Sequence, residues 1–202
     1  MDFRKLSVAS ELPIPIEKVK AAMRVDHSFE DDHVRRVFLA AVDLVEKRTR
    51  RILRPTTFEV SLRSWPCSLD DGLALDLHPI RDVTAVRYLA DGGTVPIPVD
   101  AGSWSWRGRE VGAEVYFLSS WDFPTLNGDS RAPVSVQFSA GYDSPAAQPG
   151  TDPEKILPAQ VEELLLLLAS HWFKNREAVT TGTSIEVPLS ADLLLKELRI
   201  FR

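Results

Sequence analysis

The feature that most constrains the fold of this chain is a nearly unbroken apolar helix in its last third. The segment LPAQVEELLLLLASHWFKNREAV, from Leu157 to Val179, starts with a proline in its first turn and is apolar almost all round. A break at Gly182 precedes a short amphipathic tail, PLSADLLLKELRIFR. A helix that is apolar on every side has to be covered on most of them. We therefore expect other copies of the chain, or a partner, to complete the cover, and we expect a structural role more than a chemical one.

Composition narrows the class of protein further. The chain has 202 residues, 44% of them hydrophobic, and a net charge of −5. That length suits one domain or two small joined ones, and the acidity argues against a protein that grips a nucleic-acid backbone. Cys67 is the only cysteine, so a disulfide framework or a cysteine zinc site is excluded and synthesis in a reducing compartment is expected. We expect no signal peptide, and the apolar run Leu164–Ala169 is far shorter than the roughly 20 residues of a membrane span.

Helical spacing dominates the first quarter of the sequence. Pro15 predicts the start of a short helix, and Ser28 predicts the N-cap of a longer one that closes before Pro55. Acidic residues gather at the start of the second helix and basic residues at its end, which is the order that the helix dipole favours. These are Glu30, Asp31 and Asp32 at the start and Lys47, Arg48, Arg50, Arg51 and Arg54 at the end.

From Thr56 to Tyr142 the period changes to two, which predicts antiparallel strands, with Asp91-Gly92-Gly93 as a hairpin turn. The predicted fold class is α+β, a helical bundle with an inserted small antiparallel β domain and a C-terminal extension. In this interpretation the N-terminal helices and a long C-terminal helix form the bundle from residues 1–55 and 154–180. Residues 56–143 form the β domain, and residues 181–202 form a C-terminal docking segment.

Several groups of residues are candidates for catalysis or metal binding. The stretch His27–His33 contains carboxylates and imidazoles that suit a metal, but on a helix its acids fan around the axis, which favours a helix start. His171 has no nucleophile motif beside it, so a packed or interface histidine is favoured over a base. The Arg48–Arg54 cluster suits a solvated helix end, or salt bridges to a neighbouring acidic subunit, better than contacts with DNA phosphates. The sequence therefore predicts no catalytic residues, no metal and no cofactor.

Three tryptophans leave one alternative open. Trp104 and Trp106, with Trp121, could form a stacking platform for a sugar or a base. The chain would then be a virion protein whose β module binds a ligand or carbohydrate. Tryptophans that alternate with serine in a strand are more typical of one face of a β core or of a contact between subunits.

Four stretches carry a resemblance that covers nearly the whole chain. The first, Pro13–Leu53, contains the turn MRVD and a basic helix end; the second, Leu75–Trp104, contains the strand pair around DGG. The third, Val134–Ser144, contains a strand ending in AGY, and the fourth, Leu157–Val179, contains HWFKNREA. In this order the stretches resemble the head–tail connector (adaptor, or head-completion) proteins of long-tailed bacteriophages and related gene transfer agents. Residues 104–112 and 120–131 lie outside the resemblance.

The resemblance implies a structural protein of the virion neck, made in the bacterial cytoplasm. It implies a homo-oligomeric ring of about a dozen copies, bound to the portal protein on one side and to a stopper or tail-completion protein on the other. DNA would pass through the ring without sequence-specific binding, and no membrane would be involved.

Residues for these contacts are predicted near the carboxyl end and on two helices. Docking to a partner ring is expected from the apolar residues of the tail, Leu193, Leu194, Leu198, Ile200 and Phe201. Contacts between subunits are expected from Arg48, Arg51, His171 and Trp172.

Overall fold

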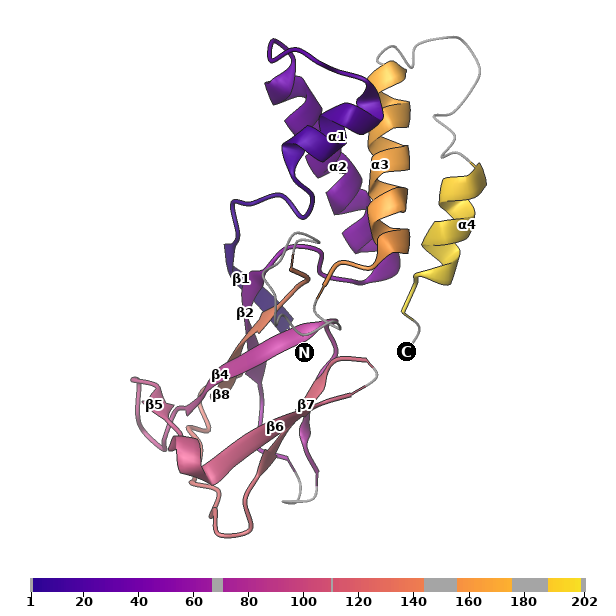
Figure 1. Cartoon of the computed structure of the whole chain (residues 1–202). Helices are drawn as coiled ribbons and strands as arrows, with labels where there is room; N and C mark the ends of the chain where they lie inside the picture. The colour runs from indigo at the N-terminus through magenta and orange to yellow at the C-terminus, as the bar shows by residue number, and fades with distance from the viewer. Residues whose placement is uncertain (1, 67–70, 110, 144–155, 176–188, 201–202) are drawn as a thin grey trace. The chain divides into compact units, whose positions relative to one another are not determined.

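The computed structural model describes residues 2–66, 71–109, 111–143, 156–175 and 189–200, and these form two compact units. One unit comprises Met1–Ala9 with Pro55–Gly141, and the other comprises Ser10–Arg54 with Tyr142–Arg202. Figure 1 shows strands in the first unit and helices in the second.

The β unit contains a five-stranded antiparallel sheet. Its order is β1 (Asp2–Val8), β2 (Thr56–Leu62), β8 (Val134–Ala140), β4 (Ile80–Tyr88) and β5 (Ile97–Pro98). Phe58 pairs with Phe138 across β2 and β8, and their rings stack at 5.6 Å. The alternation along these two strands places their apolar residues on one buried face, as a half-buried sheet requires.

A second sheet in the same unit has the order β3 (Leu73–Leu75), β7 (Ala113–Phe117) and β6 (Trp104–Gly108), with a short 3₁₀ turn at Ala101–Ser103. Gly112 precedes β7 with a φ of +80°, and a Cβ there would lie 1.9 Å from the carbonyl oxygen of Leu75. Only glycine combines this conformation with such a close approach of two backbones.

The helical unit contains α1 (Ile16–Met23), α2 (Asp31–Thr49), α3 (Ala159–Lys174) and α4 (Leu189–Glu197). In Figure 1, α1 crosses α2 and α3, and α4 lies beside α3. One hydrophobic core joins all four helices. Its fully buried members include Val19, Phe38, Leu164, Leu168 and Ala191.

The ends of α1 and α2 lie close to the positions that the sequence predicted, and the charges at the two ends of α2 suit its dipole. Pro15 occupies the N-cap position of α1, and α2 begins at Asp31 with Glu30 as its N-cap, two residues later than the predicted cap at Ser28. Arg24 and Arg50 end α1 and α2 in the left-handed conformation, with φ of 60° and 61°. Asp31 and Asp32 lie in the first turn of α2, and Lys47 and Arg48 in its last turn, so the helix dipole is complemented at both ends.

The predicted fold class was wrong in its architecture. The described residues form four mostly small helices and eight strands in two sheets, with helix and strand content about equal, and not a helical bundle with a long C-terminal helix. The predicted helix Leu157–Val179 is described as α3, Ala159–Lys174, with Asn175 as its C-cap, and residues 176–179 lie outside the described part of the chain.

Two physical reasons account for this difference. Strand β1 was not expected because it lies at the edge of its sheet, where Arg4, Lys5 and Leu6 are all exposed and no alternating pattern is imposed. Phe3 of this strand meets Phe138 edge-to-face at 6.1 Å. The run of leucines suggested a longer helix than α3, which ends at Lys174 with Asn175 as its C-cap.

None of the helices in the described part of the chain is long and apolar enough to cross a membrane.

We predict that truncating the centre of α3 costs far more stability than truncating α4 at its surface. Leu168 is fully buried, so Leu168→Ala should lower the free energy of unfolding by about 2–5 kcal/mol. Leu193 is 60% exposed, so Leu193→Ala should change it by less than about 0.5 kcal/mol. Urea unfolding of the two variants and the wild type measures both values. Equal losses would contradict the packing described for α3.

Candidate docking surface

The predicted docking residues lie on and after α4, and the structure divides them between the core and the surface. Leu198 is buried in the core of its own unit together with Ala191 and Leu195. Leu194 is half-buried against the same core, whereas Leu193 is exposed. The backbone N–H of Ile200 donates to the carbonyl oxygen of Thr49 at 3.0 Å, and Phe201 lies outside the described residues. The helix therefore has cover within its own subunit, and Leu193 is the described member of the set that faces outward most.

Arg51 holds α4 against the end of α2. Its Nε donates to the carbonyl oxygen of Leu198 at 3.1 Å, and its Nη1 donates to the hydroxyl of Tyr142 at 2.6 Å. Thr49, which is fully buried, donates its hydroxyl to the carbonyl of Val45 and accepts the backbone N–H of Arg51 at 3.3 Å. The structure thus gives Arg51, predicted for contacts between subunits, three hydrogen bonds inside its own unit.

The pKa of the Tyr142 phenol departs from its ordinary value. Burial raises the pKa of its phenol above the usual 10.0, and the Arg51 guanidinium opposes this by favouring the phenolate. Burial has the larger effect, so the phenol of Tyr142 stays neutral to a higher pH in the folded chain than in the unfolded one.

Arg48 is exposed and lines a small hollow of about 150 Å³. The other lining residues are Asp192, Leu195 and Lys196 of α4 and Arg199, which follows α4. Lys196 and Arg199 add positive charge there, while Asp192 pairs with Lys196 at 2.7 Å. The hollow is therefore rich in cations, with one carboxylate, and is suited to contact with an acidic surface.

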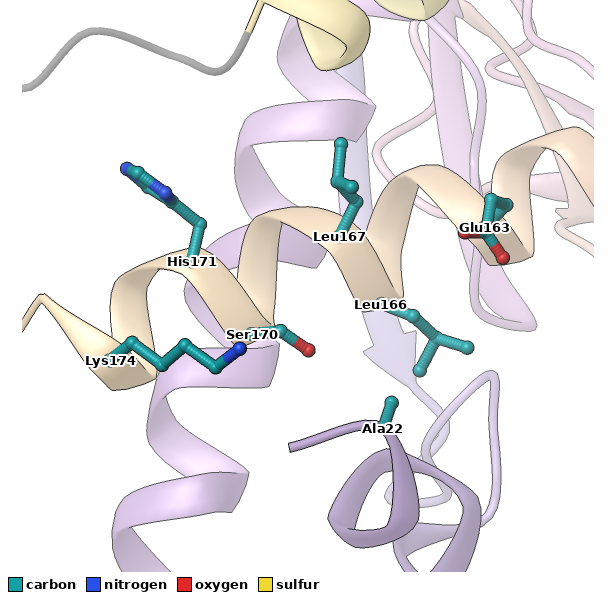
Figure 2. A pocket seen from close by; sticks show the side chains of 7 residues that line it. All are labelled: Ala22, Glu163, Leu166, Leu167, Ser170, His171 and Lys174. Atoms are coloured by element: carbon teal, nitrogen blue, oxygen red, sulfur yellow. The ribbon is translucent and has the colours of Figure 1, made fainter. Parts of the chain in front are cut away.

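His171 and Trp172 are neighbours on α3 and both are half-buried. Trp172 packs against the helical core, and the Nδ1 of His171 lies 3.3 Å from the Nδ2 of Asn175. His171 also lines a groove of about 420 Å³ along the surface of α3, which Figure 2 shows from close by. Sequence reasoning identified His171 but missed the groove, because its other side is formed by Ala22 of α1, which is distant from α3 in the sequence.

The residues considered for a metal do not converge on one point in the structure. Asp31 pairs with Lys20 at 2.6 Å, and His27 contacts Glu30 at 3.7 Å. His33 packs against the ring of Phe173 at 5.5 Å. Among the described residues, no three metal-binding side chains gather in one place.

The three tryptophans of the alternative hypothesis lie in the β unit. Trp104 and Trp106 pair across β6 and β7 with Phe117 and Val115, whose side chains are buried, so the tryptophans share that packed face. Trp121 stacks on Phe117 at 6.4 Å. This arrangement favours a β core over a stacking platform for a ligand.

Comparisons with known proteins come from structure alone, because no protein-family model and no curated protein matches the sequence. A chain from the neck of an empty gene transfer agent (GTA) particle, computed with C6 symmetry, matches with a TM-score of 0.74 at 23% identity. The match covers 100% of this chain and 97% of that one. This chain has the fold of a GTA neck chain.

Two further solved structures support the same likeness. A chain from the virion of a native GTA particle matches with a TM-score of 0.73 at 22% identity, and one from a native GTA neck computed with C12 symmetry matches at 0.72 and 20%. Each match again covers 100% of this chain and 97% of the other. The resemblance drawn from the four sequence stretches is confirmed at the level of the fold.

We predict that Tyr142 makes stability fall at high pH. Because the pKa of the phenol is higher in the folded chain, Tyr142 ionises first in the unfolded chain as the pH rises. The contribution of Tyr142 to the free energy of unfolding is therefore constant below pH 10.0 and is lost progressively above it. Tyr142→Phe should remove this part of the loss and, by deleting a charged hydrogen bond, should cost about 1–3 kcal/mol at neutral pH. Urea unfolding of both proteins from neutral pH to about pH 11 measures the difference. A gap between the two proteins that stays constant above pH 10 would contradict the prediction.

Proposed function

We propose that this chain is a structural subunit of the neck of a phage or a phage-like particle. In this proposal its copies form a ring between the portal protein and the stopper or tail-completion protein, and DNA leaves the head through the ring. The observation that carries the proposal is the match in fold over the full length of the chain, β unit and helical unit alike, to proteins of GTA particles.

The ring itself is supported by the symmetry of those particles. Two of the matching structures were computed with C6 and C12 symmetry, which are the symmetries of closed rings. In a ring built from head-to-tail contacts, each subunit buries two different surfaces, one against each neighbour. This suits a chain whose helix α3 has apolar residues left at its surface.

The charge of the chain is compatible with DNA passing through such a ring. At a net charge of −5 the protein repels a phosphate backbone on average, and tight binding along a channel would slow the exit of DNA. Base-specific contacts are not part of the proposal.

We assign the predicted contacts as part of this proposal, guided by the burial of the described residues. Exposed Leu193, together with Leu194, Ile200 and Phe201, would dock the partner ring, while buried Leu198 and half-buried Arg51 would hold α4 in position for it. Arg48, His171 and Trp172 would contact neighbouring subunits.

Removing the protein should separate heads from tails. We expect particles made without this chain to appear in electron micrographs as DNA-filled heads and free tails, because the neck would lack one ring. Expression of the wild-type chain from a plasmid should restore joined particles, and a ring should be visible below the portal. Joined, DNA-delivering particles in the absence of the chain would refute the proposed function.

A charge at the exposed face of α4 should prevent docking without unfolding the subunit. Leu193→Glu places a carboxylate where the proposal expects an apolar contact, so we expect at least a tenfold loss of joined particles with thermal unfolding unchanged. Leu6→Glu, at an exposed leucine of the β unit, is the matched control and should assemble normally. Normal assembly of the Leu193→Glu particles would exclude this face as the docking site.

A further inference from the structure

An exposed aromatic side chain marks the turn between α1 and α2. Phe29 is 95% exposed, the highest value among the exposed large hydrophobic residues of the described chain, and its only described ring contact is with His27 at 5.9 Å. A phenylalanine this exposed contributes almost nothing to the stability of its own subunit. Large aromatic residues are, by contrast, typical anchors of protein interfaces.

The groove on α3 is the matching concave feature of the same unit. Its walls are two rows along the helix, Glu163–Leu167–His171 and Leu166–Ser170–Lys174, and Ala22 of α1 lies opposite. Figure 2 shows Leu166 pointing toward Ala22, with Ser170 and Lys174 farther along the same row. The small side chains of Ala22 and Ser170 leave the space, and half-buried Leu166 and Leu167 make it apolar.

Size and charge agree between the two features. A groove of about 420 Å³ has room for a phenyl ring, and leucine side chains are suitable neighbours for it. Phe29 lies in the sequence between exposed Asp26 and exposed Asp32, and the groove ends at exposed Lys174. The groove carries exposed Lys174 at one end and exposed Glu163 at the other, so the acids near Phe29 in the sequence would be attracted to the Lys174 end.

We propose that Phe29 of one copy inserts into the groove between α1 and α3 of the next copy. This inference rests on the proposed function and names the contact that would build the ring. Phe29 is exposed in its own subunit and so does not fill its own groove, which means that the contact joins unlike surfaces of two copies. Contacts of this head-to-tail kind generate rings when the rotation closes. Residues 176–188 of the same chain, or another neck protein, are the competing occupants of the groove.

Removing the aromatic ring of Phe29 tests the half of the contact that inserts into the groove. Phe29→Ala should leave thermal unfolding unchanged, because the residue is exposed, and should weaken each contact about tenfold or more, so that few joined particles form. Val95→Ala, at another exposed apolar residue but in the β unit, should assemble as the wild type does. Phe29→Ala particles that join in wild-type numbers would overturn the proposal.

A cysteine pair tests the contact from both sides at once. In a Cys67→Ser background that keeps Phe29, Ser28→Cys next to it and Ser170→Cys in the groove should form disulfides between copies under mild oxidation of purified particles, giving a ladder of covalent oligomers on a non-reducing gel. Each single cysteine variant should stay monomeric on the same gel. A disulfide that closes within one chain would overturn the proposal.

The same particles separate failure of the contact from failure of the proposed function. If electron microscopy shows the ring in place but the cysteine pair gives no ladder, or if a map shows residues 176–188 or another protein in the groove, the contact is wrong and the neck function stands. If the particles contain no ring of this chain, the proposed function and the contact fail together.

Discussion

The rest of the helical unit depends on how α3 buries its leucines. Five consecutive leucines, Leu164–Leu168, place apolar side chains all round the helix. Three of them, Leu164, Leu165 and Leu168, are fully buried among the other helices, while Leu166 and Leu167 stay half-buried at the surface. One subunit can cover only part of such a helix. The surplus forms the groove beside α1, so the same run of residues both builds the core and leaves a surface suited to association.

Local patterns predicted the elements whose two faces have clearly different surroundings. The alternation of Phe58 and Val60 with polar residues identified β2, because a strand with one buried face has apolar residues at every second position. The charges at both ends of α2 identified that helix, because they match its dipole. The edge strand β1 left no such trace. The architecture was also missed because periodicity identifies single elements, whereas the order β1-β2-β8-β4-β5 depends on pairing between distant segments.

The candidate site shows the same limit at the level of single residues. An amphipathic tail with apolar residues on one face reads the same whether it packs on its own subunit or on a partner, so the sequence grouped Leu193 with Leu198 although one is exposed and the other buried. Arg51 looked like a surface cation at a helix end. Its partners Tyr142 and Leu198 lie 91 and 147 positions away, and no local pattern reveals contacts over such separations.

In α4, buried Leu198 contributes to the core of its own unit, whereas exposed Leu193 is free to contact a partner. This arrangement suits the proposed function, in which the subunit folds first and then assembles. Leu198 and Arg51 hold α4 within its own unit, so the docking face proposed at Leu193 would be in place before a partner binds, which would reduce the entropy lost on docking. A contact that rests on one phenyl ring in a shallow groove is weak when two copies meet in solution. Around a closed ring every subunit makes it twice, and a template that holds neighbours together raises their effective concentration. Weak single contacts therefore favour assembly at the particle over premature rings elsewhere.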